Sequence, residues 1–139
     1  MNVEKYCRRS IVAIRAQASV LEAAELMRAR QTSFLVVFNE GDSARKPIGV
    51  VTDHDIVHQV TALQADAAAV LVGDIMTRRP LVAKAREDLG DFMQRMRMAG
   101  VRRAPVVDAH GRLLGIIAAN EVLDAIAGLL DGPSSQRVQ

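Results

Sequence analysis

The hydrophobic and polar positions of the first half of the chain recur in the second half. With an offset of 69 residues, the apolar run 11–14 falls on 80–83. The offset then drops to 66, because the turn at 40–47 is three residues longer than its counterpart, and 49–51 falls on 115–117. Such a self-match indicates two copies of one supersecondary unit. At about sixty residues each, the copies are near the lower limit for independent folding, so we expect them to pack together.

Each copy carries the pattern strand, helix, strand, strand, helix. Ser19 followed three residues later by Glu22 forms a capping box, and apolar residues at helical spacing come after it. In the second copy Asp88 begins the matching helix and Gly100 ends it. The predicted fold class is therefore α+β, with two tandem β-α-β-β-α repeats packed face to face through their sheets. The predicted strands are 11–14, 35–38, 48–51, 80–83, 104–107 and 113–117, and the closing helices lie within 56–63 and 122–130.

The repeat divides the chain into two domains and a tail. Residues 1–69 are predicted to form the first repeat, and residues 70–131 the second, with a linker at 72–77 between the repeating elements. Residues 132–139, which begin Gly-Pro-Ser-Ser, are predicted to be a disordered tail. Pro105 has no backbone N–H to donate, so its strand is expected at a sheet edge.

The composition is that of a globular protein with an aliphatic core. Half of the 139 residues are hydrophobic, and the lone Cys7 cannot form an internal disulfide, which suits a reducing compartment. The N-terminus lacks the apolar run of a signal peptide, and the longest apolar runs, such as 34–38 and 67–72, are too short to span a bilayer. We therefore expect a soluble, cytoplasmic protein with no membrane partner.

The charged and aromatic residues argue against a nucleic-acid partner. The 18 basic residues nearly balance the 16 acidic ones, and the arginines are spread in pairs rather than gathered in one stripe. One Tyr and three Phe are too few for a base-stacking platform. The arginine pairs nevertheless leave a nucleic-acid-associated regulator as an alternative.

The segment 49–56 is the most informative candidate site, because it ends a buried strand and opens a helix. The free amides at such a helix start favour a phosphate, and Thr52 adds a hydroxyl donor. Asp55 offers a carboxylate that can accept from both hydroxyls of a ribose. The same spacing also suits plain helix capping by Thr52 or Asp53, and that interpretation needs no ligand.

Metal binding and catalysis are weaker interpretations. His54 and His58 share one helix face, but a zinc site needs a third ligand, and only His110 and Cys7 remain outside the acidic residues. We therefore expect no metal and no cofactor other than a regulatory ligand. The chain has no Gly-x-Ser-x-Gly elbow, Walker loop or dinucleotide-binding fingerprint, and no evident pair of nucleophile and base. We expect no catalytic residues and no enzymatic activity.

Three segments, together with the repeat, resemble a known family. They are Asp74-Ile75-Met76-Thr77-Arg78-Arg79-Pro80, the run from Val101 to Asp108, and Gly49-x-x-Thr52-x-x-Asp55. Residues 5–130 resemble a tandem pair of cystathionine β-synthase (CBS) domains, a Bateman module. The resemblance implies a regulatory module that binds an adenosine-containing ligand, such as AMP, ADP, ATP or S-adenosylmethionine, in the cleft between its domains. Such modules commonly associate into four-domain discs.

The resemblance also implies the residues of the site. The hydroxyl of Thr52 would meet phosphate, the carboxylate of Asp55 would meet ribose, and Arg102 of the facing domain would reach phosphate. The predicted ligand-binding residues are Thr52, Asp55, Arg102, Val51 and Asp53.

The second copy departs from this motif. Ala118 stands where a hydroxyl is expected, Glu121 replaces the Asp, and Ser33 stands where the second copy has Arg102, so a second site at Glu121, Ala118 and Ser33 is expected to be weak or empty. This degenerate motif leaves a non-binding interaction scaffold as the main alternative. Apolar faces on the closing helices predict a homodimer, and regulation would act in trans on a partner protein.

Overall fold

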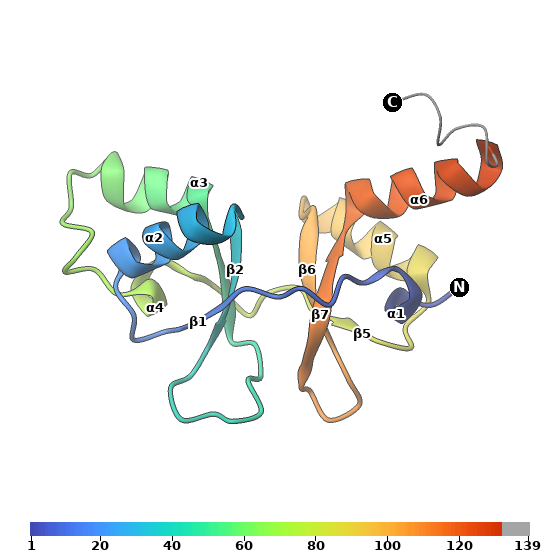
Figure 1. The fold of residues 1–139 in the computed structure, drawn as a ribbon, viewed down its shortest axis with the longest axis horizontal. Helices are drawn as coiled ribbons and strands as arrows, with labels where there is room; N and C mark the ends of the chain where they lie inside the picture. The colour runs from blue at the N-terminus through green and yellow to red at the C-terminus, as the bar shows by residue number, and fades with distance from the viewer. Residues whose placement is uncertain (132–139) are drawn as a thin grey trace.

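Two β-sheets face each other at the centre of the computed structural model, which describes residues 1–131, and the helices lie on their outer sides (Figure 1). We call the body around the first sheet the first unit and the body around the second sheet the second unit. The predicted α+β fold, with two repeats packed through their sheets, is confirmed. The predicted tail at 132–139 lies outside the described residues.

The first sheet has four strands in the order β1-β2-β3-β4, with β1 parallel to β2 and the other pairs antiparallel. The capping box predicted at Ser19 is present, because the Ser19 N–H donates to Glu22 Oε2 at 2.7 Å and the Glu22 N–H donates to Ser19 Oγ at 3.1 Å. The predicted closing helix begins as an α-helical turn and continues as π-helix. The elements are β1 (Ala13–Arg15), α2 (Val20–Arg30), β2 (Phe34–Phe38), β3 (Gly49–Thr52), α3 (Asp53–Ile56), the π-helix Val57–Thr61 and β4 (Thr77–Arg78).

The second sheet has the order β5-β6-β7, so the strand of Pro105 is central and its predicted edge position is wrong. The proline is tolerated because Ile116, its partner on β7, directs its N–H and C=O to Arg8 instead of to Pro105. On the other side, β5 begins to pair only at Val106. The elements are β5 (Ala83–Lys84), α5 (Leu89–Ala99), β6 (Arg103–Val107), β7 (Leu113–Ala118) and α6 (Ala119–Asp131).

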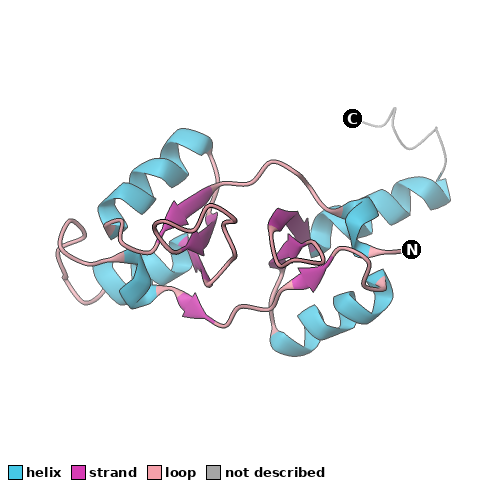
Figure 2. Cartoon of the chain, turned by 90° about the horizontal axis from the view of Figure 1, so that it is seen from below, coloured by secondary structure: helices cyan, strands magenta, loops and turns pink. Residues whose placement is uncertain are grey.

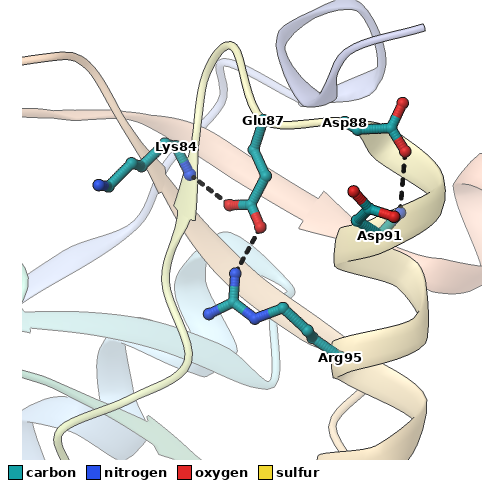
Figure 3. Close-up of polar contacts among 5 residues, drawn as sticks. All are labelled: Lys84, Glu87, Asp88, Asp91 and Arg95. Carbon is teal, nitrogen blue, oxygen red and sulfur yellow. Dashed lines mark hydrogen bonds and ion pairs between the residues drawn. The ribbon is translucent and has the colours of Figure 1, made fainter.

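Acidic side chains fix the start of α5 where the sequence predicts it (Figure 3). Asp88 Oδ2 accepts a hydrogen bond of 3.0 Å from the Asp91 N–H. Glu87 accepts from the Lys84 N–H at 3.3 Å and forms an ion pair with Arg95. Asp88 thereby caps the first turn of α5, and Glu87 links the helix to Lys84 at the end of β5.

The N-terminal residues belong to the second unit in space, although they precede the first repeat in sequence (Figure 1). Helix α1 (Val3–Tyr6) places Val3, which is fully buried, in the core of the second unit. Arg8 and Ile116 exchange two backbone hydrogen bonds of 2.8 Å, which extends the second sheet beyond β7.

The predicted linker 72–77 precedes the second repeat in sequence but packs on the first unit, so the leading segments of the two repeats are exchanged between the units. Residues Val72–Ile75 form a helical turn, α4, that packs on the first unit, and β4 follows it. The Val72 N–H donates to the Ala18 carbonyl at 2.8 Å, and the side chain of Val72 is fully buried. The predicted linker therefore contains a helical turn and a two-residue strand. The boundary between residues 69 and 70 divides the repeat in sequence, whereas the units in space exchange their leading segments.

The two units meet through apolar strand residues and two crossing segments. Phe34, Val36 and Ile116 form a buried cluster between the sheets. The chain crosses between the units near residues 9–12 and 79–82, once along each side of the joint (Figure 2). A crossing segment therefore runs along each side of the joint, next to both units.

Candidate functional site

A cleft of about 240 Å³, called the first cleft below, opens at the joint between the units. The first unit contributes Phe34, Val50, Thr52 and Asp55. The second unit contributes Arg102, Arg103 and Pro105, and the crossing segment contributes Pro80 and Leu81. The structure thus brings Thr52, Asp55 and Arg102, which are up to 50 residues apart in sequence, to one cleft.

Thr52 and Asp55 form a capping box at the start of α3. The Thr52 N–H donates to Asp55 Oδ2 at 2.9 Å, and the Asp55 N–H donates to Thr52 Oγ1 at 3.2 Å. Both side chains are half-buried. The capping interpretation and the ligand interpretation are compatible, because the Thr52 hydroxyl hydrogen and Asp55 Oδ1 make no hydrogen bond within residues 1–131.

Two of the predicted ligand-binding residues do not line the first cleft with their side chains. Val51 is fully buried in the core of the first unit, and its neighbour Val50 lines the cleft instead. Successive strand residues face opposite sides of a sheet, so only one of the two can reach the cleft. Asp53 is exposed, and its Oδ1 accepts from the His54 N–H at 2.8 Å.

Arg103 lines the first cleft beside Arg102 and was not predicted from the sequence. Arg102 is exposed, whereas Arg103 is half-buried. The Arg103 guanidinium donates from Nη2 to Ser33 Oγ at 3.0 Å, and its Cζ lies 5.0 Å from the centre of the Phe34 ring. In the sequence, only its position next to Arg102 indicates that Arg103 lines the cleft.

A second cleft of about 180 Å³ lies on the other side of the joint, where the first crossing segment runs. Arg8, Ser10, Arg30 and Phe34 are among its lining residues. Arg8 and Arg30 are not predicted from the sequence, although extending the 69-residue offset toward the N-terminus aligns Arg8 with Thr77, which lines the first cleft.

None of the three residues predicted for the weaker site lines this second cleft. Glu121 forms an ion pair of 3.2 Å with Arg8. Ala118 is buried at the end of β7, and Ser33 accepts from Arg103 at the first cleft. The comparison of Ser33 with Arg102 does not take account of Arg8, which the exchanged N-terminal segment brings to the second motif.

The histidine pair and the helices bear on metal binding and on membrane insertion. The rings of His54 and His58 stack with centroids 4.0 Å apart. Within residues 1–131, no three His, Cys, Asp or Glu side chains are grouped as metal ligands. In the same part of the chain, each helix is too short or too polar to cross a bilayer.

Two α+β repeats joined through their sheets, with a cleft at the joint, define a paired-repeat module. The CBS domain model matches residues 3–62 and 72–128, and the chain belongs to the CBS domain family as a tandem pair. Both matched segments begin at the exchanged helical turns α1 and α4.

Proteins of a plant and of an archaeon are similar to this chain over most of its length. The chain is 30% identical over 139 residues to the CBS domain-containing protein CBSX1 (chloroplastic) of Arabidopsis thaliana, which covers 81% of this chain and 57% of that protein. It is 28% identical to an uncharacterised protein of Methanopyrus kandleri, over 88% of this chain and 61% of that protein. The chain thus spans less than two thirds of each of these relatives.

Solved structures show the same fold. The crystal structure of CBSX2 from Arabidopsis thaliana matches with a TM-score of 0.78 and 27% identity, over 94% of this chain and 97% of that chain. A structure of CBSX2 in complex with AMP matches with a TM-score of 0.75 and 28% identity, over 92% of this chain and 97% of that chain.

Proposed function

We propose that this CBS-domain pair is a regulatory sensor that binds an adenosine-containing ligand, such as AMP, ADP, ATP or S-adenosylmethionine, in the first cleft. The observation that carries the proposal is the convergence of Thr52, Asp55 and Arg102 on one cleft between the units. The similarity to CBSX2, whose structure has been solved in complex with AMP, supports the same ligand class.

Different residues of the cleft suit the phosphate, the ribose and the base of such a ligand. The Thr52 hydroxyl and the Arg102 guanidinium are donors that suit a phosphate, and the free oxygen of Asp55 suits a ribose hydroxyl. Val50 and Pro105 offer apolar surface against which a base can pack. The exposed Arg102 can adjust its long side chain to the bound anion.

Calorimetric titration with AMP, ADP, ATP and S-adenosylmethionine tests this proposal. Asp55→Ala should weaken binding by about tenfold to a hundredfold, because a hydrogen bond to a charged acceptor contributes about 1.5–3 kcal/mol. Glu22→Ala is the matched control, since Glu22 is the carboxylate of the capping box on α2 and lies outside the cleft. It should lower stability in the same way while leaving the dissociation constant unchanged.

Binding at the second motif should be weak. Glu121→Ala should change affinity by less than about threefold, because Ala118 cannot donate to phosphate and Glu121 is engaged by Arg8. The expected stoichiometry is one nucleotide per chain. Two sites of equal affinity per chain would contradict the assignment of a single working site. A harmless Asp55→Ala together with a damaging Glu121→Ala would place the working site in the other copy. Silence of the whole ligand panel in calorimetry and thermal shift would favour the interaction scaffold.

The proposal includes a homodimer that passes ligand occupancy to a partner protein. Leu123, Leu129 and Leu130 on α6 are exposed, and Val57 and Leu63 are exposed at the end of the first unit. Exposed apolar faces of this kind mark protein interfaces. Light scattering at tens of micromolar is expected to give twice the 15.1 kDa mass of one chain. A monomer at this concentration would count against the dimer.

A further inference from the structure

Two exposed histidines on the closing helix of the first unit lie against each other. His54 belongs to α3, and His58 is the second residue of the π-helix that follows, four residues later in sequence. Their rings stack with centroids 4.0 Å apart and planes inclined by 28°. In the described part of the chain, the ring nitrogens of this pair form no hydrogen bond or ion pair. They are therefore open to a ligand from solution.

The separation of the two rings is close to that of a metal chelate. Two imidazole nitrogens that each lie about 2.0–2.1 Å from a tetrahedral metal ion are about 3.3 Å from each other. Rings with centroids 4.0 Å apart reach this spacing by side-chain rotation, which the exposure of both residues allows. Binding an ion at this pair therefore requires no movement of the backbone.

The charges around the histidine pair favour a cation. Residues 53–64, which contain both histidines, include two Asp and no Lys or Arg. Asp53 is exposed and adjoins His54, and the carboxylate of Asp55 caps the same helix. A positive ion at the pair would be attracted by both carboxylates and repelled by no charge on its own helix.

The pair also spans a change in the helix. The backbone is α-helical at His54 and π-helical from Val57, where the Ala62 N–H donates to the Val57 carbonyl at 2.8 Å. Short π-helical segments are rare and occur frequently at functional sites. An ion held by both rings would connect the α-helical turn to the π-helix.

We propose that His54 and His58 form a binding site for a divalent transition-metal ion, such as Zn²⁺, Cu²⁺ or Ni²⁺, on the outer helical side of the first unit (Figure 1). Imidazole is a suitable ligand for each of these ions. One chain supplies only two ligands, because no three His, Cys, Asp or Glu side chains are grouped within residues 1–131. Water, or the histidine pair of a second copy, fills the remaining positions. A second copy can reach the site, since Val57 belongs to the exposed apolar face of the proposed homodimer.

Calorimetric titration of the natural chain with ZnCl₂, CuCl₂ and NiCl₂, without an affinity tag and without nucleotide, tests the site. His54→Gln and His58→Gln should each weaken binding by at least about tenfold, because each removes one of the two ligands. His110→Gln is the matched control, since His110 lies in the turn before β7, and it should leave the dissociation constant unchanged. A stoichiometry of one ion per chain would assign the other positions to water, and one ion per two chains would assign them to a second copy.

Paramagnetic Cu²⁺ locates the site in the natural chain. It should broaden the amide NMR signals of residues 53–61 before those of any other segment. Broadening centred elsewhere, unchanged binding in both histidine variants, or an equal loss in His110→Gln would overturn the inference. Failure of all three ions to bind the natural chain would also overturn it. The proposed function survives each of these results, because binding of adenosine compounds is measured in the absence of metal.

Discussion

Val3 should be as important for stability as a residue in the middle of the chain. Residues so near an N-terminus are normally expected to fray, and substitutions there to cost little. In this protein Val3 is fully buried among residues of the second unit, and its repeat counterpart Val72 is fully buried in the first unit. Because the leading segments are exchanged, Val3 stabilises the second unit and Val72 stabilises the first unit.

The cost of Val3→Ala follows from the atoms removed. Loss of two buried methyl groups costs about 1.6 kcal/mol of transfer free energy, at about 0.8 kcal/mol each. The cavity left in a core that relaxes only partly adds about 1 kcal/mol. We expect Val3→Ala to lower the free energy of unfolding by about 2–3 kcal/mol, and Val72→Ala to have a similar effect.

Urea unfolding measures the size of each effect, and amide hydrogen exchange locates it. Val3→Ala should speed exchange mainly in β6 and β7, and Val72→Ala mainly in β2 and β3, because each valine packs on the opposite unit from its sequence repeat. A loss below about 0.5 kcal/mol for Val3→Ala would refute the docking of the N-terminal segment. Faster exchange in the first unit instead of the second would refute the exchange of segments.

Three further substitutions probe the exchanged segment, the equivalent position in the first unit and the capping box. Gly115→Ala should cost about 1–3 kcal/mol in urea unfolding, because its Cβ would collide with the Arg8 carbonyl oxygen; Gly49→Ala should cost less, since the nearest atom there belongs to the flexible Met76 side chain. Equal costs would contradict this reasoning. The backbone hydrogen bond from Ser19 lowers the pKa of Glu22 below 4.5, so its contribution to stability is full above pH 4.5 and is lost as the pH falls through the lower folded-state pKa. The difference in urea midpoint between the natural chain and Glu22→Gln should therefore shrink on acidification, and a difference that grows would contradict the capping role.

Local signals predicted most of the helices and strands. The starts of α2 and α5 were predicted from Ser19 and Asp88, because a capping residue acts within one turn of its own backbone. The strands on either side of each turn were predicted from short apolar runs. The four-residue helices α1 and α4 were missed, since one turn is too short to show a helical period.

The candidate site divides in the same way. Thr52 and Asp55 are three residues apart, so their spacing alone indicates that they meet at a helix start. Val51 is buried and Val50 lines the cleft, a difference that the sequence does not show, because alternation along a strand does not say which of its faces is covered by the core. Arg103 was missed, because its partners Ser33 and Phe34 are about 70 residues away and come from the other unit.

The sequence by itself determined the repeat, the order of elements, and the residue types at the start of α3. Periodicity, capping and turn chemistry depend on neighbours within a few residues, so they can be read along the chain. The tertiary structure alone decided that the leading segments exchange units, that Arg8 meets Glu121, and that Ser33 holds Arg103. These contacts join residues far apart in sequence. They depend on which apolar faces the two units bury against each other, and no local pattern encodes that choice.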